Sequence, residues 1–276
     1  MLTEIAIADA YGAGFEFCAQ EKIISNNNLE MYSKHELYDI SGKYTDDTQM
    51  SIAIAEFILS GEEWTKENVA SKFLECFKRD VRLGYSEGFY SLLNQVQSGE
   101  ELLKTLVPTS ERNGAAMRSV PIGFLKNKND VISFATLQAQ ITHNTELGIS
   151  SSCAVSLAAF WGLKERGRLT ELRSFLQSED FAEWDFNWQN RVSLSAYDTI
   201  SAAFSCLLKY DSLSQLLKAC IELGGDTDSV ASIAVGLATC FSEYKNDLPL
   251  QLFDMLKEDQ YGLSFLKELE TKLTHL

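Results

Sequence analysis

The spacing of the apolar residues restricts the fold of this chain more than any other feature. They recur every three or four residues in segment after segment, which places them along one face of an α-helix, whereas a strand needs strict alternation. Only three prolines interrupt the 276 residues. The pattern predicts helices over 46–60, 65–77, 89–96, 131–142, 200–207, 213–224, 229–241, 249–256 and 263–273. We therefore expect an all-α fold.

Residues that cap helices mark some of the predicted ends. Thr65 stands directly before an apolar stripe, in the position of an N-cap. Ser98-Gly99 follows the stripe at 89–96, and we interpret it as the end of that helix. The first helix is expected to begin almost at Met1.

The segment 146–163 differs from the others because apolar residues lie on several of its sides. It reads ELGISSSCAVSLAAFWGL and is rich in Ala, Ser and Gly, so we predict a central, buried helix. No Gly/Ser linker, low-complexity tract or fixed-period repeat divides the chain. We expect a single compact domain over 1–276, with irregular loops near 26–28 and 184–190.

The charge of the chain argues against one class of partner. The sequence has 24 Lys and Arg against 39 Asp and Glu, a formal net charge of −15. Binding to a nucleic-acid backbone depends on Lys and Arg that displace counterions. We therefore do not expect nucleic acid as the main partner, although an acidic protein still binds small anions through backbone N–H groups or a metal ion.

The cysteines and the N-terminal segment bear on the cellular location. The six cysteines are scattered, without a C-x-x-C pair or a histidine at zinc-finger spacing, which favours buried, reduced thiols over a nucleophilic cysteine. The N-terminal segment lacks the basic start of a signal peptide. No apolar run approaches the ~20 residues that span a bilayer. We expect a cytoplasmic protein without a membrane partner.

Two acidic loops each stand directly before an apolar stripe. The first reads YTDDTQM at 44–50 and the second reads GGDTDS at 224–229. Asp, Thr and Ser cap helix N-termini, and carboxylates complement the helix macrodipole, so capping alone explains either loop in isolation. Capping does not require two carboxylates in both loops.

If the two loops meet in space, their carboxylates form a site for a hard cation. Clustered carboxylates repel one another unless a cation compensates them. Oxygen donors suit Mg²⁺ or Mn²⁺, whereas zinc prefers His or Cys. An EF-hand is excluded, because counting from Asp226 puts Val230 and Leu237 at positions that need oxygen ligands. The candidate ligands are the carboxylates of Asp46, Asp47, Asp226 and Asp228 and the hydroxyls of Thr45 and Ser229.

A stretch near the middle of the chain has residues suited to an anion. Ser110 and Asn113 can donate to phosphate oxygens, and Gly114 lets a ligand approach the main chain. We interpret Arg112 and Arg118 as surface or salt-bridge residues.

Two further polar residues are candidates for the functional site, and each has two interpretations. His143 lies between two predicted helices, where a structural hydrogen-bonding role competes with ligand contact. Glu16, between Phe15 and Phe17, is either a partly buried functional carboxylate or a surface residue.

Taken in order, these segments resemble the ADP-ribosylglycohydrolase family, which includes bacterial dinitrogenase-reductase-activating glycohydrolases and ADP-ribosylhydrolases. The motifs that carry the resemblance run from residue 7 to 238 and read IADAYGAGFEF, YTDDTQMSIAIAEFIL, RNGAAMRSVPIG, ITHNTELG and GGDTDSVASIAVGLA. The resemblance implies an all-α fold around a binuclear centre with two Mg²⁺ ions, for which Mn²⁺ can substitute. It also implies hydrolysis of the bond between ADP-ribose and an acceptor, on a modified protein or small molecule, with release of ADP-ribose.

The same resemblance implies roles for individual residues. The metal ligands would be Thr45, Asp46, Asp47, Asp226, Asp228 and Ser229. Glu16, Asp46 and Asp47 are the candidates for the catalytic carboxylate. The substrate contacts would be Ser110, Asn113 and Gly114 for the diphosphate, His143, and Tyr197 for stacking on adenine. The chain departs from the family pattern at Ala8 and at Arg112, where glycine is usual.

Two other functions remain open from the sequence. One is a non-catalytic helical protein that binds ADP-ribose or serves structurally, like crystallin-type relatives of the family. The other is a metal-dependent phosphohydrolase that cleaves the diphosphate of an ADP-ribose-like nucleotide. The complete set of ligand-type residues favours the glycosidic hydrolase over the first of these.

Overall fold

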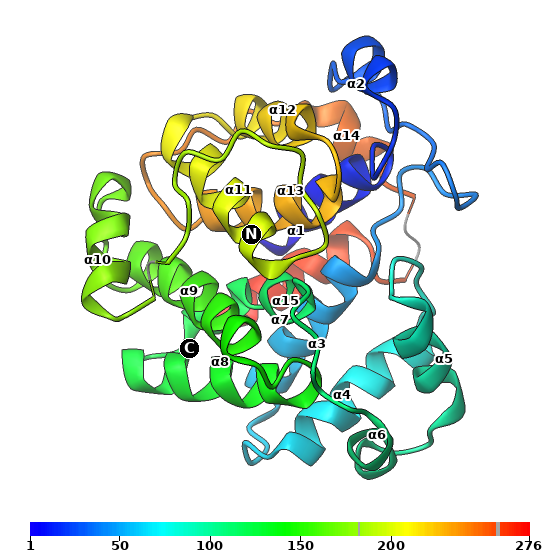
Figure 1. The fold of residues 1–276 in the computed structure, drawn as a ribbon, viewed down its shortest axis with the longest axis vertical. Coiled ribbons are helices and arrows are strands. Elements are labelled where there is room, and N and C mark those ends of the chain that lie inside the picture. Colours follow the sequence, from blue (N-terminus) through cyan, green and yellow to red (C-terminus); the bar gives the residue numbers. More distant parts are fainter. Residues whose placement is uncertain (182, 258–259) are drawn as a thin grey trace.

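A computed structural model describes residues 1–181, 183–257 and 260–276 (Figure 1). Over these ranges the regular structure is helical and no strand is present, which confirms the predicted all-α fold. The elements are α1 (Leu2–Ala13), α2 (Gln20–Asn26), α3 (Asp46–Ser60), α4 (Lys66–Arg79), α5 (Glu87–Gln95), α6 (Gly99–Thr105), α7 (Gly114–Met117), the 3-10 helix η1 (Val120–Phe124), α8 (Lys128–Thr142), α9 (Glu146–Leu163), the 3-10 helix η2 (Leu169–Glu171), α10 (Leu172–Ser178), α11 (Ala196–Lys209), α12 (Leu213–Leu223), α13 (Thr227–Ala238), α14 (Leu250–Asp254) and α15 (Leu263–Thr274).

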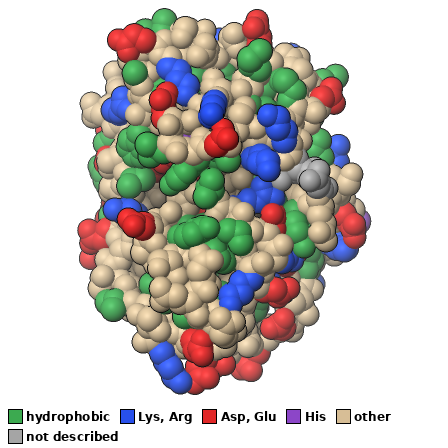
Figure 2. Space-filling model, turned by 90° about the vertical axis from the view of Figure 1, so that its right-hand side faces the viewer, with side chains coloured by type: hydrophobic (Ala, Val, Ile, Leu, Met, Phe, Trp, Pro, Cys, Tyr) green, Lys and Arg blue, Asp and Glu red, His purple; other side chains and the backbone are tan. Residues whose placement is uncertain are grey.

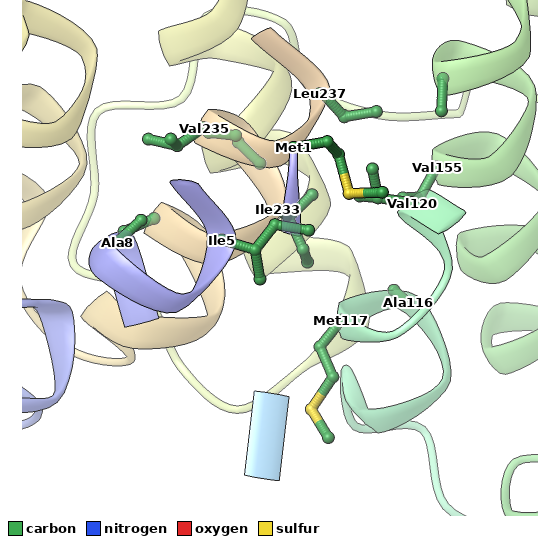
Figure 3. Close-up of a cluster of buried hydrophobic side chains, with 14 of the residues drawn as sticks. Met1, Ile5, Ala8, Ala116, Met117, Val120, Val155, Ile233, Val235 and Leu237 are labelled. Atoms are coloured by element: carbon green, nitrogen blue, oxygen red, sulfur yellow. The ribbon is translucent and has the colours of Figure 1, made fainter. Parts of the chain in front are cut away.

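The packing of α1 against α13 forms the centre of the molecule. Figure 3 shows Ile5 of α1 against Ile233 of α13, and both side chains are fully buried. Gly236 allows the close approach, since a Cβ there would lie 2.7 Å from Cγ1 of Ile5. At the other end of the contact, a Cβ on Gly12 would lie 2.5 Å from the Cα of Asp228. The end of α1 is therefore held beside the start of α13.

The predicted buried helix is confirmed as α9, which spans Glu146–Leu163. It packs against α8, α7 and η1 (Figure 1). Among the described helices, α9 alone is long and apolar enough to cross a membrane by length and composition, and 67% of it is buried inside the protein. Such burial is typical of the core helix of a globular domain.

The helix ends show which local signals are dependable. Thr65 caps α4 as predicted. The interpretation of Ser98-Gly99 as a helix end is wrong, because α5 already ends at Gln95 and the Ser98 hydroxyl accepts a hydrogen bond from the Glu101 N–H at the start of α6. A serine directly before a helix accepts a hydrogen bond from an otherwise unpaired N–H group at the start of that helix. The apolar stripe of α5 does not show that a second helix follows at once.

The exposed hydrophobic surface is partly concentrated at one cavity. Figure 2 shows a face on which charged and hydrophobic side chains mix, with a group of hydrophobic ones near the middle. The exposed large hydrophobic side chains include Phe17, Leu37 and Val107, and all three line the same cavity. This cavity therefore has an apolar rim. All six cysteines are buried free thiols, as predicted.

Candidate metal centre and active site

The cavity with the apolar rim collects most of the predicted site residues. It has a volume of about 550 Å³, within the usual range for small-molecule sites. The predicted residues that line it are Glu16, Asp46, Asp47, Ser110, Asn113, Gly114, His143, Asp226, Asp228 and Ser229. Thr45 and Tyr197 are not part of its lining.

The two acidic loops meet, as the sequence analysis required for a metal site. Asp47 lies in the first turn of α3, and Ser229 and Ser232 lie in α13. The Ser232 hydroxyl donates to Oδ1 of Asp47 over 2.9 Å, and the Ser229 hydroxyl lies 3.4 Å from Oδ2. The capping interpretation is not confirmed, because the N-cap residues Thr45 and Asp226 make no side-chain capping hydrogen bond. The side chains of the two loops instead contact one another across the fold.

A third element brings a further carboxylate to the same place. Glu16 follows the end of α1, and one oxygen each of Glu16, Asp226 and Asp228 lie within 4.8 Å of one another. Within the described ranges, no Lys or Arg forms an ion pair with Asp46, Asp47, Asp226 or Asp228. Within these ranges, then, no ion pair with a Lys or Arg neutralises the centre of this cluster.

Burial and mutual repulsion make these carboxyl groups hard to ionise in the metal-free protein. Burial, followed by the neighbouring carboxylates, raises the pKa of Asp46, Asp47 and Asp228 well above the ordinary value. Burial also raises the pKa of Asp226 to about 6. The cluster therefore needs either protons or a cation, and its carboxylate and hydroxyl oxygens are the donors that hard divalent cations prefer. The residues present fit such an ion.

Asp9 is a buried carboxylate that the sequence analysis missed. It accepts hydrogen bonds from the backbone N–H groups of Thr45 and Thr48 at 2.9 and 3.0 Å and from their hydroxyls at 2.8 and 2.5 Å. It thereby fixes the first turn of α3, which carries Asp46 and Asp47. The Thr45 hydroxyl uses its hydrogen in the bond to Asp9, so the lone pairs of its oxygen remain free to accept. The sequence did contain a signal for it, since Asp9 is the acidic residue within the otherwise apolar run 5–10 of α1.

Asn113, which also lines the cavity, is used differently from the prediction. Its side-chain amide donates to Thr199 Oγ1 at 3.0 Å and to Asp226 Oδ2. Both amide hydrogens are therefore committed within the protein, and Asn113 orients an acidic residue of the second loop. The Ser110 hydroxyl accepts from the N–H of Arg112 at 3.2 Å and lies in the cavity lining.

His143 lies beside the glycine of the same loop. A Cβ on Gly114 would lie 2.8 Å from Cε1 of His143, so only glycine leaves room for the ring. The ring Nδ1 lies 2.6 Å from the hydroxyl of Thr142. Burial and the nearby Arg118 and Arg112 lower the pKa of His143 to about 3, so the imidazole is neutral at physiological pH.

The interpretation of Arg118 as a surface or salt-bridge residue is wrong. It is 1% exposed, lines the cavity and donates to Gln138 and to the Thr142 hydroxyl. Among the described residues it forms no ion pair. Burial lowers its pKa to about 9. Arg112 is exposed and also lines the cavity, so both carboxylates and positive side chains line this cavity.

Tyr197 is not brought to the cavity. Its ring lies 6.1 Å from that of Trp184 and 6.3 Å from that of Trp188, in a separate aromatic group. The aromatic side chains that do line the cavity are Phe17, Tyr38, Tyr85 and Phe89. The structure therefore gives no support for stacking of a ligand in the cavity on Tyr197.

The comparison with known families decides the identity of this fold. A sequence model of the family described as ADP-ribosylglycohydrolase matches residues 5–275. The chain belongs to the ADP-ribosylglycohydrolase family. It is accordingly a hydrolase of glycosidic bonds, and the match extends across both acidic loops and the phosphate-loop candidate.

Individual relatives agree with this assignment. ADP-ribosylhydrolase ARH3 of Xenopus tropicalis is 24% identical over 256 residues, which cover 72% of this chain and 73% of that protein. ADP-ribosylarginine hydrolase Tri1 of Serratia proteamaculans is 21% identical over 277 residues, covering 94% of this chain and 75% of Tri1. A solved structure described as an ADP-ribosylglycohydrolase-related protein complex superposes with a TM-score of 0.75 at 17% identity, covering 99% of this chain and 94% of the other. This structural likeness shows the shared fold.

Proposed function

We propose that this ADP-ribosylglycohydrolase requires Mg²⁺ to hydrolyse the bond between ADP-ribose and an acceptor on a protein or small molecule. The meeting of the two acidic loops with Glu16 in one cavity supports the proposal most directly. A binding protein has no need to gather unpaired buried carboxylates, since an uncompensated buried charge is costly.

The oxygen donors around the cluster would hold two Mg²⁺ ions, with Mn²⁺ as a substitute. The proposed ligands are Thr45, Asp46, Asp47, Asp226, Asp228 and Ser229. When bound, the ions supply positive charge that neutralises these carboxylates and orients ribose hydroxyls and water. Asp9, Asn113 and Ser232 each hold one of the ligand-bearing segments by hydrogen bonds.

The reaction adds water across one bond. The bond between the anomeric carbon and the acceptor breaks, water supplies the new oxygen on that carbon, and the acceptor leaves with a proton. Positive charge develops on the ribose ring in such reactions, and the carboxylates of the cluster stabilise it. The residue that takes the proton from water is one of Glu16, Asp46 and Asp47, which all line the cavity.

The segment 110–118 suits the diphosphate of ADP-ribose. Gly114 begins α7, Ser110 lines the approach, and Arg118 and Arg112 bring positive charge to this segment. The neutral ring of His143 can accept or donate a hydrogen bond there without adding charge. The buried free thiols favour a reducing compartment, and the proposal includes a cytoplasmic location and substrates other than nucleic acid.

A panel of defined ADP-ribosylated peptides and small molecules, incubated with and without Mg²⁺ and analysed by mass spectrometry, tests the proposal. An arginine-linked peptide belongs in the panel because Tri1 is named as an ADP-ribosylarginine hydrolase. We expect intact ADP-ribose as the product, only with Mg²⁺, and none from Asp228→Asn. The matched control Glu268→Gln removes an exposed carboxylate of α15 and should keep full activity.

Other products would replace the proposal with one of the remaining functions. AMP and ribose phosphate would indicate a phosphohydrolase. Tight binding of ADP-ribose by calorimetry, with no turnover of any substrate, would indicate a non-catalytic binding protein.

A further inference from the structure

His35 connects a loop outside the acidic cluster to Glu16. Its Nε2 lies 2.7 Å from Oε2 of Glu16, and the His35 side chain is almost fully buried. The other ring nitrogen, Nδ1, accepts the backbone N–H groups of Leu37 at 2.9 Å and Tyr38 at 3.1 Å. Backbone N–H groups only donate, so Nδ1 is an acceptor and the ring hydrogen lies on Nε2. His35 therefore donates to Glu16.

The loop that carries His35 holds the ring in one orientation. The backbone N–H of His35 bonds to the carbonyl of Ile40 at 3.0 Å. The ring of Tyr38 lies 4.6 Å from the imidazole, tilted by 34°. With both ring nitrogens bonded and one face covered, the imidazole cannot turn without breaking contacts.

Few interactions hold the side chain of Glu16 at the cluster. The bond from His35 is the only side-chain hydrogen bond of Glu16 within the described part of the chain. The side chain of Glu16 is 20% exposed, so a path to solvent is open. Repulsion from Asp226 and Asp228 favours that path, because their oxygens lie within 4.8 Å of a Glu16 oxygen.

We propose that His35 is a positioning residue that keeps the Glu16 carboxylate at the acidic cluster. It acts through Glu16 and does not line the cavity itself. The inference rests on the proposed function, because it assigns Glu16 a part in that site as a metal ligand or as the group that activates water. The hydrogen bond from His35 offsets the repulsion and the side-chain entropy that would otherwise release Glu16.

Two substitutions of His35 separate its two contacts. The Oδ1 of asparagine can take the place of Nδ1 and accept from the N–H groups of residues 37 and 38, as in an Asx turn, but the side chain is too short to reach Glu16. Glutamine places an amide donor near the position of Nε2 and restores the contact with Glu16. His35→Asn therefore keeps the hydrogen bonds to the loop and loses the one to Glu16. His35→Gln keeps the hydrogen bond to Glu16 and loses those to the loop.

Two readouts test the proposal: calorimetric titration of the metal-free protein with Mg²⁺, and kcat for release of ADP-ribose. We expect His35→Asn to lower the Mg²⁺ affinity or kcat by roughly 10- to 100-fold, the usual effect of losing a partner that orients a metal-site ligand. KM and the melting temperature should stay close to the wild-type values, and His35→Gln should recover part of the loss. The double variant His35→Asn/Glu16→Gln should lose no more Mg²⁺ affinity or kcat than Glu16→Gln alone, since both substitutions remove the same interaction.

The outcomes distinguish this proposal from the proposed function. Wild-type values of both kcat and Mg²⁺ affinity in His35→Asn overturn the positioning role, as does additive loss in the double variant. If the wild-type protein releases no ADP-ribose but binds Mg²⁺, the proposed function fails and the calorimetric comparison still decides the role of His35. A protein that neither binds Mg²⁺ nor turns over substrate overturns both.

Discussion

Ser232 of α13 donates a hydrogen bond to Asp47 of α3, with 2.9 Å between its Oγ and Oδ1 of the carboxylate. Both residues are buried, and they are 185 positions apart in the chain. The contact joins the two acidic loops through their helices. It also orients the carboxylate of Asp47, whose other oxygen lies 3.4 Å from the Ser229 hydroxyl.

Ser232→Ala is expected to lower the Mg²⁺ affinity and kcat by roughly 10-fold, because groups that orient metal ligands typically contribute 10- to 100-fold. Calorimetry and steady-state release of ADP-ribose measure the two effects. The control Ser156→Ala removes a fully buried hydroxyl that, among the described residues, bonds to two backbone carbonyls and lies outside the cavity lining. An equal loss of Mg²⁺ affinity in this control would contradict the role of Ser232.

The stability of the metal-free protein is expected to fall as the pH rises from 5 to 7.5. Burial raises the pKa of Asp9 and of Asp226 from 3.8 to about 6. Because the folded state holds these protons more tightly than the unfolded state, their contribution is complete below pH 3.8 and is lost as the pH passes the folded value. The pKa values of Asp46, Asp47 and Asp228 are raised as well.

Thermal unfolding in EDTA at both pH values measures this effect. We expect a melting temperature lower by roughly 5 °C at pH 7.5, since 1 kcal/mol corresponds to about 2–4 °C in proteins of similar size. Mg²⁺ should restore more stability at pH 7.5 than at pH 5, because it binds the ionised carboxylates. Asp226→Asn should weaken the pH dependence. Greater stabilisation by Mg²⁺ at pH 5 would contradict the explanation.

The helices and the two acidic loops could be predicted because their signals are local. Apolar spacing identifies the buried face of α3 and α13, and acidic residues at their starts are visible without knowledge of the fold. The resemblance of ordered motifs then supplied what the local signals lack, namely that the two loops belong to one site.

The partners of buried polar groups could not be predicted, because tertiary packing determines them. Asp9 meets Thr45 across 36 positions, and His35 meets Glu16 across 19. Nothing near Arg118 in the sequence indicates that Gln138, not a carboxylate, receives its N–H groups. The same limit explains why Asn113 turned out to orient an acidic residue of the second loop.

Asp9→Asn tests the missed carboxylate. All four groups around Asp9 are donors from Thr45 and Thr48, and the amide nitrogen of asparagine cannot accept from them. We expect a loss of about 3 kcal/mol in the free energy of unfolding, since hydrogen bonds to charged groups contribute about 1.5–3 kcal/mol each. Mg²⁺ affinity should fall as well, because the turn that carries Asp46 shifts. Chemical denaturation and calorimetry measure the two quantities.

Thr48→Val provides a graded comparison for this prediction. It removes one donor to Asp9 and keeps the branched shape of the side chain, so its loss of stability should be smaller than that of Asp9→Asn. Wild-type stability in Asp9→Asn would show that the four hydrogen bonds do not stabilise the start of α3.

Gly84→Ala is expected to abolish Mg²⁺ binding and catalysis while the protein still folds. Gly84 has a φ of +106°, and a Cβ there would lie 2.0 Å from Oδ1 of Asp46, so the carboxylate must move. Gly61 is the matched control, because its φ is +72° but a Cβ there meets nothing within 4 Å.

Both substitutions strain a left-handed backbone by about 1 kcal/mol, so both should lower the melting temperature in thermal unfolding. Only Gly84→Ala displaces a carboxylate of the cluster, so Gly61→Ala should retain Mg²⁺ affinity and turnover. Equal activity in the two variants would show that the position of Asp46 does not matter for the reaction.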